Sequence, residues 1–426
     1  MKHTNCLFFS LSLLAVASIL SCHKDQLFDK EYYRYYVKSN YPVDTLENDH
    51  PWTLLQRYHV AVTADASDTG IREVRLYNGS PTLGDETELV AQADIRPGMT
   101  ATLSYDIAKS AQNTMYAALV TSSGTTYYTT FAIGQDSVNI GPGHMIRLTK
   151  MPVTATQTFT YLFESSFPTP DDFDYNDVVL RISRKAPKTN HLQLTVTLAA
   201  VGCNKQVAGA IRLPGVGYNQ VEQVTINEGV PFDKDYPYTR IMIDSDNELA
   251  SSRNGEAVIR LFEDAHWSLM KTLNDMGMVD HQPCNTQHFD DVDTIAVVSP
   301  ITRTYNIYFK EGVNADSLRL ADIDPFIIEM NTNINFEVHT YQYKFQETRW
   351  QYMSDDKTAY DDYLAWALLI PDGNFSYPIE TVPLGTYRNR ELYGAYGRPG
   401  HSFGEWGRNY RVAYDWWQYP SKVLTY

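Results

Sequence analysis

The chain has 426 residues, which is longer than most single domains and suggests two or three of them. Its hydrophobic content of 43% is enough to form buried cores, and its 31 tyrosines occur mostly in alternating runs typical of β-strands. The 35 Lys+Arg against 51 Asp+Glu give a formal net charge of -16. Such a charge would repel phosphate backbones, so nucleic acid is not an expected partner.

Residues 1–22 have the pattern of a bacterial lipoprotein signal sequence. The apolar run from Leu7 to Leu20 is shorter than the roughly 18 residues that a transmembrane helix needs. The small residue Ser21 stands directly before Cys22, as a lipoprotein signal peptidase requires. We therefore predict that Cys22 is acylated and that its acyl chains anchor the protein to the membrane. An ordinary secretory peptide with an incidental cysteine is the alternative.

Residues 23–50 are polar and rich in tyrosine, and we expect them to form a tether between the anchor and the folded part. Short alternating runs separated by turn residues then predict an N-terminal β-sandwich over residues 51–142. The turn-forming run Gly141-Pro142-Gly143 marks its predicted end. The predicted strands are Tyr58–Ala64, Arg72–Tyr77, Met99–Tyr105, Met115–Thr121 and Thr125–Ile133.

A second, larger β-domain is predicted over residues 154–426. Between its strands, apolar residues recur at three- and four-residue intervals from Glu256 to Met276, which predicts one amphipathic helix. The predicted fold class is therefore mainly β, with two tandem β-sandwich-like domains, the second of which includes this helix. The strands predicted in the second domain are Thr158–Phe163, Val178–Ile182, Leu192–Ala199, Thr304–Phe309 and Asn335–Tyr343.

The segment 163–183 carries the clearest chemical pattern in the chain. Its acidic and amide residues alternate with Phe173 and Tyr175 just before an apolar strand, so the oxygens should point one way and the rings the other. Clustered carboxylates repel one another unless a cation lies between them, and calcium accepts six to eight oxygen ligands at about 2.3–2.6 Å. The predicted calcium ligands are Asp171, Asp172, Asp174, Asn176, Asp177 and, from upstream, Glu164.

This segment is not an EF-hand, although its first three ligand spacings fit one. The sixth position is Asp177 where an EF-hand has glycine, and the twelfth is Ser183 where it has glutamate. The alternative to a calcium site is a solvated acidic turn whose side chains only cap and hydrogen-bond the backbone.

The acidic segment resembles the signature of the LruC domain, a family found in bacterial lipoproteins and exported proteins. The resemblance rests on Asp174, Tyr175, Asn176 and Asp177 before a valine-rich strand. Softer matches are ADIDPFIIEMN, Glu337-Val338-His339, LAWALLIPDGNFSYPIE and YPVDTLENDHPWTLLQRYHVAVTAD. The chain departs from the family at Thr340-Tyr341-Gln342, where a turn with proline and glycine is commoner, and in its long carboxyl-terminal tail. The resemblance implies an exported or surface domain and brings no established enzymatic activity.

Two cysteines, Cys203 and Cys284, remain beyond the signal sequence. They are expected either to form a disulfide in an oxidising compartment or to be two buried thiols. The set His281, Cys284 and His288 could supply three zinc ligands, but no fourth ligand is evident and the neighbouring residues have the composition of a solvated loop.

The sequence contains no nucleophile elbow, zinc-protease helix, phosphate-binding glycine loop or dinucleotide fingerprint. We therefore predict a non-enzymatic, calcium-stabilised interaction or adhesion module that its lipid anchors in the cell envelope, at the outer membrane, with an unknown protein or glycan ligand. Whether it faces the cell surface or the periplasm stays open. The alternative is a carbohydrate-active enzyme or glycan-binding lipoprotein, since paired carboxylates can cleave glycosides and aromatic rings can stack on sugars. The candidate rings are Trp406, Tyr410, Tyr414, Trp416, Trp417 and Tyr419.

Overall fold

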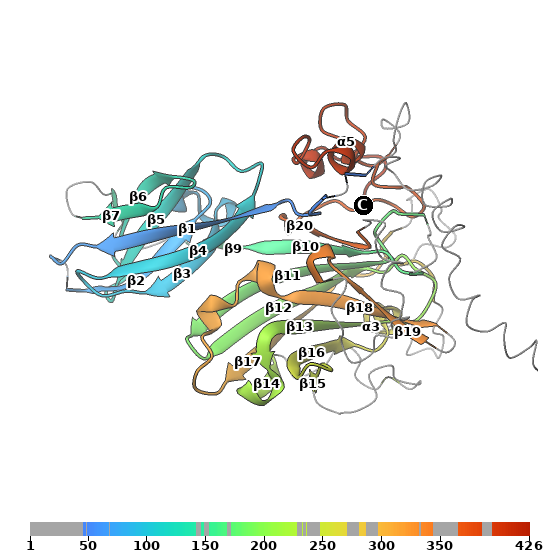
Figure 1. The fold of residues 1–426 in the computed structure, drawn as a ribbon, viewed down its shortest axis with the longest axis horizontal. Coiled ribbons are helices and arrows are strands. Elements are labelled where there is room, and N and C mark those ends of the chain that lie inside the picture. The colour runs from blue at the N-terminus through green and yellow to red at the C-terminus, as the bar shows by residue number, and fades with distance from the viewer. Residues whose placement is uncertain are drawn as a thin grey trace, which may run out of the picture.

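The computed structural model shows a mainly β protein, as the sequence predicted. Two β-sandwiches follow one another along the long axis of the molecule (Figure 1). Among the described residues, no helix is long and apolar enough to cross a membrane. The predicted lipid-bearing Cys22 lies outside the described residues. These are residues 46–47, 49–67, 69–141, 146–148, 153–167, 172–227, 232, 236, 248–270, 281–286, 297–331, 334–343, 365–385 and 394–426.

The first sandwich packs a sheet of order β4-β1-β7 against a sheet of order β8-β6-β5-β2-β3-β9. Its core consists of alternate residues of these strands, such as Val60 and Val62 of β1, because successive side chains of a strand point to opposite faces. The last two strands lie beyond Gly143, where the sequence predicted the end of this domain, and they pair with β6 and β3. The first sandwich therefore extends to Thr156. Its strands are β1 (Leu55–Ala64), β2 (Ile71–Tyr77), β3 (Glu88–Asp94), β4 (Thr100–Ala108), β5 (Thr114–Thr121), β6 (Thr126–Ala132), β7 (Ser137–Ile140), β8 (Ile146–Leu148) and β9 (Ala155–Thr156).

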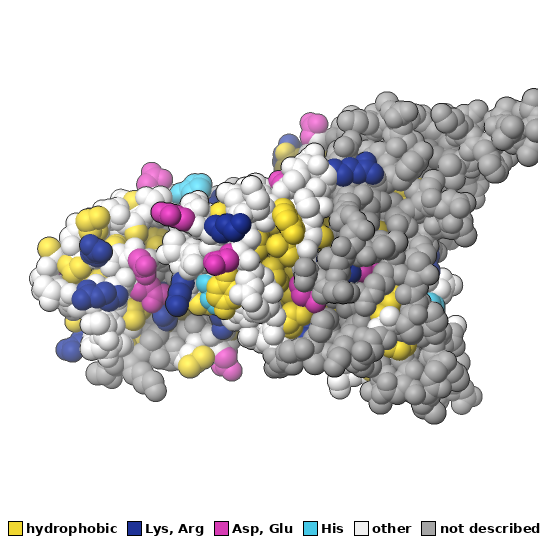
Figure 2. Space-filling view, turned by 90° about the horizontal axis from the view of Figure 1, so that it is seen from below, with side chains coloured by type: hydrophobic (Ala, Val, Ile, Leu, Met, Phe, Trp, Pro, Cys, Tyr) yellow, Lys and Arg dark blue, Asp and Glu magenta, His cyan; other side chains and the backbone are white. Residues whose placement is uncertain are grey.

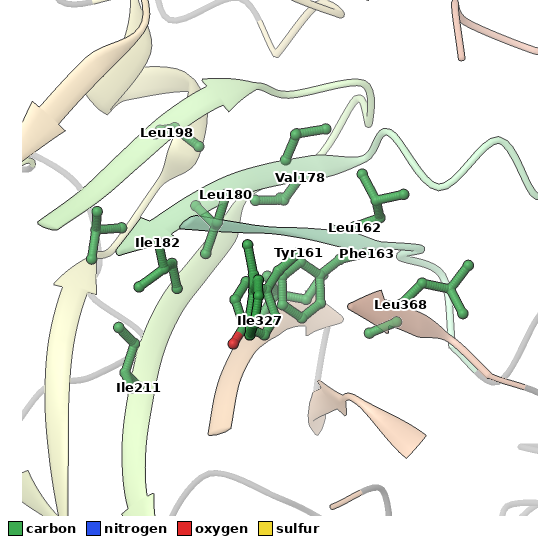
Figure 3. Packing of buried hydrophobic residues seen from close by; sticks show 14 of the residues in the cluster. Tyr161, Leu162, Phe163, Val178, Leu180, Ile182, Leu198, Ile211, Ile327 and Leu368 are labelled. Atoms are coloured by element: carbon green, nitrogen blue, oxygen red, sulfur yellow. The ribbon is translucent and has the colours of Figure 1, made fainter. Parts of the chain in front are cut away.

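The second sandwich packs a sheet of order β14-β17-β12-β11-β10-β20 against a sheet of order β15-β16-β13-β18-β19. Side chains from both sheets, such as Ile182 and Ile211, fill the layer between them (Figure 3). The strands are β10 (Thr158–Phe163), β11 (Val178–Lys188), β12 (His191–Ala200), β13 (Val207–Gly217), β14 (Val221–Ile226), β15 (Leu249–Ser251), β16 (Glu256–Phe262), β17 (Ile301–Phe309), β18 (Asp324–Asn331), β19 (Ile334–His339) and β20 (Ala367–Ile370).

The described helices are short. The α-helices are α3 (Ala265–Leu269) and α5 (Phe403–Arg408), and the second of them is not predicted from the sequence pattern. The 3-10 helices are η1 (Pro81–Glu86), η2 (Tyr218–Gln220), η3 (Ala315–Ser317), η4 (Leu320–Asp322), η5 (Tyr341–Tyr343) and η8 (Trp416–Gln418).

The helix predicted from Glu256 to Met276 begins only at Ala265, and the prediction was wrong for Glu256–Phe262. That stretch is β16, whose residues are buried except for the first. A strand buried on both faces is apolar throughout, so a short apolar run fits a helical period equally well. The side chain of Asp264 then caps α3, because it accepts hydrogen bonds from two backbone N–H groups of the first turn.

The carboxyl-terminal segment packs over the start of β1 (Figure 1). Although His50 belongs to the predicted tether, it is buried, and its Nε2 donates to the backbone oxygen of Trp406 at 2.9 Å. The Trp52 and Trp406 rings meet edge to face at 5.3 Å. An ion pair of 2.5 Å also joins Glu47 to Arg411. The last residues of the predicted tether are therefore part of the folded structure.

The two sandwiches meet through ion pairs. The guanidinium of Arg57 lies 2.8 Å from Asp106 within the first sandwich and 2.6 Å from Asp322 of the second. A hollow of about 200 Å³ lies at this junction, and its lining includes Trp52 and Tyr341. On the face seen in Figure 2, charged side chains of both signs are interspersed over the described surface.

Candidate functional site

The acidic turn, residues 172–177, is built around the carboxylate of Glu164. This residue directly follows β10 and is fully buried. Its Oε1 accepts a hydrogen bond from the backbone of Phe173 at 3.0 Å, and its Oε2 accepts one from the backbone of Tyr175 at 2.9 Å. Both donor residues have a φ of 58°, a left-handed conformation that is unusual outside glycine. The strained backbone of the turn therefore directs two N–H groups at one carboxylate.

The aspartates of the turn hold its ends in place. Oδ1 of Asp174 accepts from the backbone of Asn176 at 3.0 Å, and Oδ2 accepts from the backbone of Thr381 at 2.8 Å. A carboxylate oxygen of Asp177 accepts from the backbone of Ser165. Each of these acids thus satisfies backbone donors that would otherwise lose hydrogen bonds on burial.

The rings of the turn point into the core, as the alternation predicted. Phe173 and Tyr175 are buried in the main core of the second sandwich. The hydroxyl of Tyr175 donates to the backbone oxygen of Ala365 at 2.5 Å. The rings therefore fix the turn to the sandwich, while the carboxylates face one another.

Mutual repulsion of these carboxylates is strong. Oxygens of Glu164, Asp172 and Asp174 lie within 4.8 Å of one another. Burial, followed by the negative charges of Asp177 and Asp174, raises the pKa of Glu164 well above its ordinary value. Burial, followed by Asp172 and Asp177, likewise raises the pKa of Asp174. A cation bound between them would favour the charged forms and offset this repulsion.

The structure brings together half of the predicted ligand set. Glu164, Asp172 and Asp174 share one site, with oxygens no farther apart than about twice a calcium–oxygen distance. Asp177 accepts from the backbone of Ser165, and its negative charge acts on Glu164 and Asp174 from beside the site. The amide of Asn176 donates to the backbone oxygen of Pro378 at 3.0 Å. The remaining predicted ligand, Asp171, lies outside the described residues.

Sequence reasoning missed the contribution of residues 365–381. The backbone oxygen of Trp366 accepts from Glu164 N at 2.9 Å, and the backbone of Thr381 binds Asp174. The negative charge of Glu380 also acts on Asp174. No local pattern marks these residues as partners of the turn, although the LruC-like segment LAWALLIPDGNFSYPIE ends at Glu380.

The two cysteines are buried thiols in the structure rather than a disulfide. Their surroundings give the reason: Cys203 lies in the main core, and Cys284 pairs through its backbone with Val201. Burial raises the pKa of the Cys284 thiol to about 12, so the reactive thiolate is disfavoured. In the zinc set considered from sequence, His288 lies outside the described residues.

The carboxyl-terminal rings divide into two groups. Trp406 and Trp416 are fully buried and pack with Phe403 in the core. The other four candidate rings keep some exposure. The two buried tryptophans therefore cannot offer a sugar-stacking face to solvent.

Part of the second sandwich matches a known family of protein domains. Residues 188–399 match the family model described as "Domain of unknown function (DUF4842)". This match covers slightly less than half of the chain and begins after the acidic turn. A crystal structure described as that of a "Putative lipoprotein from Bacteroides ovatus" has 15% sequence identity and a TM-score of 0.45, over 84% of this chain and 99% of that chain. No curated protein matches the sequence. Residues 188–399 are thus similar to the DUF4842 domain, whose function is unknown.

Proposed function

We propose that the chain is a lipid-anchored, exported interaction module without catalytic activity, whose second sandwich is stabilised by calcium at the acidic turn. The observation that carries the proposal is the structural use of the buried acids. The carboxylate oxygens of Glu164 and Asp174 accept hydrogen bonds from backbone N–H groups of the turn and of Thr381. Carboxylates so engaged organise a fold, whereas a catalytic acid or base must face a substrate.

Calcium at the turn would be held by Glu164, Asp172 and Asp174, and it would supply positive charge beside Glu164 and Asp174, whose described hydrogen-bond donors are backbone N–H groups. An oxygen-only donor set suits calcium, and extracellular calcium modules commonly bind at about 10⁻⁴–10⁻³ M. The LruC-like motif around Asp174 and Asp177 supports an exported domain, in keeping with the lipoprotein pattern at Cys22.

Ligand binding is expected at the junction of the sandwiches. The hollow there is lined by the partly exposed ring of Tyr341 and by the charged residues Arg57 and Asp322, while the Trp52 ring in its lining is buried. Its volume of about 200 Å³ is below the size of a typical drug-binding pocket and suits one side chain or one sugar ring. This lining also favours the second candidate, a glycan-binding or carbohydrate-active protein.

A glycan array and a hydrolysis screen on the purified chain separate these functions. The proposal expects binding at most, reduced by Asp322→Ala at the hollow. Reproducible turnover that is lost on mutating one pair of carboxylates would establish an enzyme instead.

The calcium proposal is tested by thermal melts in calcium, in chelator and in magnesium. At 100 times the dissociation constant, calcium should stabilise the native state by about 2.7 kcal/mol, and magnesium should do so poorly because it requires tighter octahedral geometry. The double variant Asp174→Asn with Asp177→Asn should lose the calcium response. The matched control, Asp85→Asn with Asp136→Asn on the exposed surface of the first sandwich, should keep it. Identical wild-type melts in all three conditions would refute calcium binding.

The anchor is tested by metabolic palmitate labelling. Cys22→Ala should abolish the label, because no other side chain replaces the thiol in the thioether, and globomycin should cause unprocessed wild-type chain to accumulate. Persistent labelling of Cys22→Ala would contradict the lipoprotein assignment.

A further inference from the structure

A second cluster of metal-ligating side chains lies where β16 leads into α3. Asp264, His266 and His281 each place one donor atom within 4.8 Å of the other two. Nε2 of His281 lies 2.8 Å from Oδ2 of Asp264, and Nδ1 of His266 lies 3.7 Å from Oδ1 of the same carboxylate. Asp264 and His266 are fully buried, whereas the side chain of His281 is 33% exposed.

A hydrogen bond to a backbone carbonyl fixes the orientation of the His266 ring. Its Nε2 lies 2.8 Å from the backbone oxygen of Cys203. A carbonyl oxygen only accepts, so Nε2 carries the hydrogen, and in the neutral ring the lone pair is on Nδ1. A backbone carbonyl behind a histidine is the usual second partner of a metal-bound imidazole, because it sets the tautomer and holds the ring.

The spacing between the donors of His266 and Asp264 is near that of a small tetrahedral metal ion, whereas His281 Nε2 forms a hydrogen bond of 2.8 Å with Asp264 Oδ2 that a bound ion would replace. Bonds of about 2.0–2.1 Å in a tetrahedron place two donor atoms roughly 3.3 Å apart. The 3.7 Å between His266 Nδ1 and Asp264 Oδ1 exceeds this value by a few tenths of an ångström. It is also too long for a hydrogen bond between them. The carboxylate itself is held by the backbone N–H groups of His266 and Trp267, at 2.9 Å and 3.2 Å.

We propose that Asp264, His266 and His281 form a zinc site that leaves one coordination position open. Two imidazoles and one carboxylate are donors that suit zinc, whereas calcium prefers oxygen ligands alone. The partly exposed His281 gives the ion access from solvent, and a water or a ligand group would complete the tetrahedron. This set shares only His281 with the His281, Cys284 and His288 set considered from sequence, and it does not depend on the proposed function.

The zinc site and the acidic turn are attached to the same short segment. Gly202 N donates to the backbone oxygen of Asn176 in the turn at 3.0 Å, and the next residue, Cys203, accepts from His266. Zinc at one end of this segment would therefore help to hold the acidic turn at the other.

The experiment is a zinc titration of the purified full chain in millimolar calcium, followed by calorimetry and by the visible spectrum of bound cobalt. We expect one equivalent of zinc and the intense cobalt absorption of a tetrahedral site. His281→Gln should weaken zinc binding at least tenfold, and because His281 is partly exposed its metal-free melt should stay near that of the wild type.

The matched control is His401→Gln. The His401 side chain is 34% exposed and lies 2.8 Å from Asp415, so it repeats the pair formed by His281 and Asp264, and among the described residues no third ligand completes it. It should leave zinc binding unchanged. The proposal is overturned if the chain binds no stoichiometric zinc, if His281→Gln binds as well as the wild type, or if His401→Gln weakens binding to the same extent.

Discussion

The second sandwich holds two buried clusters of charge that are compensated in different ways. The first is the Asp324 cluster, which consists of Asp324, Arg212, His339 and Glu337. The carboxylate of Asp324 is fully buried and lies 2.9 Å from the guanidinium of Arg212 and 3.0 Å from the imidazole of His339. In the acidic turn, the described partners of Glu164 are backbone N–H groups and its charged neighbours are other acids. A buried anion is costly unless it is paired, so the first cluster is complete within the chain and the second gains from an added cation.

The softer LruC-like motifs meet in the Asp324 cluster. The segment ADIDPFIIEMN supplies Asp324, and Glu337-Val338-His339 supplies Glu337 and His339. Glu337 binds His339 Nε2 at 2.9 Å, and the ring of His339 stacks on Phe326 at 4.6 Å. Two motifs separated in sequence are thus joined on neighbouring strands β18 and β19.

The largest effect is expected from removing the internal cation of the Asp324 cluster. Arg212→Met leaves a buried carboxylate without its guanidinium and should cost about 3–5 kcal/mol in the free energy of unfolding. Urea denaturation measures this loss. The control Arg75→Met breaks a 2.8 Å ion pair with Glu73 on the partly exposed surface and should cost at most about 1 kcal/mol. Equal losses in the two variants would contradict the special role of burial.

The two clusters should change the stability of the protein in different ranges of pH. Burial lowers the pKa of His339, but Asp324 and Glu337 outweigh it and raise the pKa to about 9. The stabilisation is therefore complete below the unfolded value near 6.5 and is lost as pH rises to 9, by roughly 3 kcal/mol. His339→Gln should flatten this alkaline limb of the stability curve, and calcium should leave the limb unchanged.

The stability of the protein should also fall as pH rises because of the acidic turn, but in a lower range of pH. Because the pKa values of Glu164 and Asp174 are raised, the chelated protein should gain stability as pH falls from neutral towards 4.5. Calcium competes with these protons and should reduce the gain. Denaturation at several pH values, with calcium and with chelator, checks this, and a curve indifferent to calcium would count against the site.

A smaller effect is expected at Gly202, which supports the acidic turn. A Cβ added there would lie 1.8 Å from Oδ1 of Asn176 and 3.0 Å from its backbone oxygen. Gly202→Ala should therefore cost about 1–3 kcal/mol by overpacking and should weaken calcium binding. At Gly215, where no atom lies within 4 Å of the added Cβ but φ is +78°, alanine should cost only the backbone strain and leave calcium binding intact.

Local sequence patterns predicted the alternating strands well and the partners of the site poorly. The strand predicted at Leu192–Ala199 agrees with β12 to within one residue at each end, because most of its side chains alternate between half-buried and buried positions and alternation is a local signal. The strand β16 was mistaken for a helix, since burial on both faces erases the alternation. Thr381 and Glu380 could not be predicted as neighbours of Asp174, because strand pairing between β10 and β20 brings them there from about two hundred residues away.

The smallest effect should come from Asp172, the partly exposed member of the acidic turn. Asp172→Asn removes one negative charge beside Glu164 and Asp174 but keeps the shape of the side chain. In chelator the variant should be more stable than the wild type by about 1 kcal/mol, because a partly exposed charge is screened by solvent. In millimolar calcium the order should reverse, since the variant has lost a charged ligand. The exposed Asp136→Asn should shift neither melt. Such a crossing of the two stabilities is what a cation site produces and what a solvated turn does not; parallel shifts in both conditions would leave the acidic turn without a role in binding calcium.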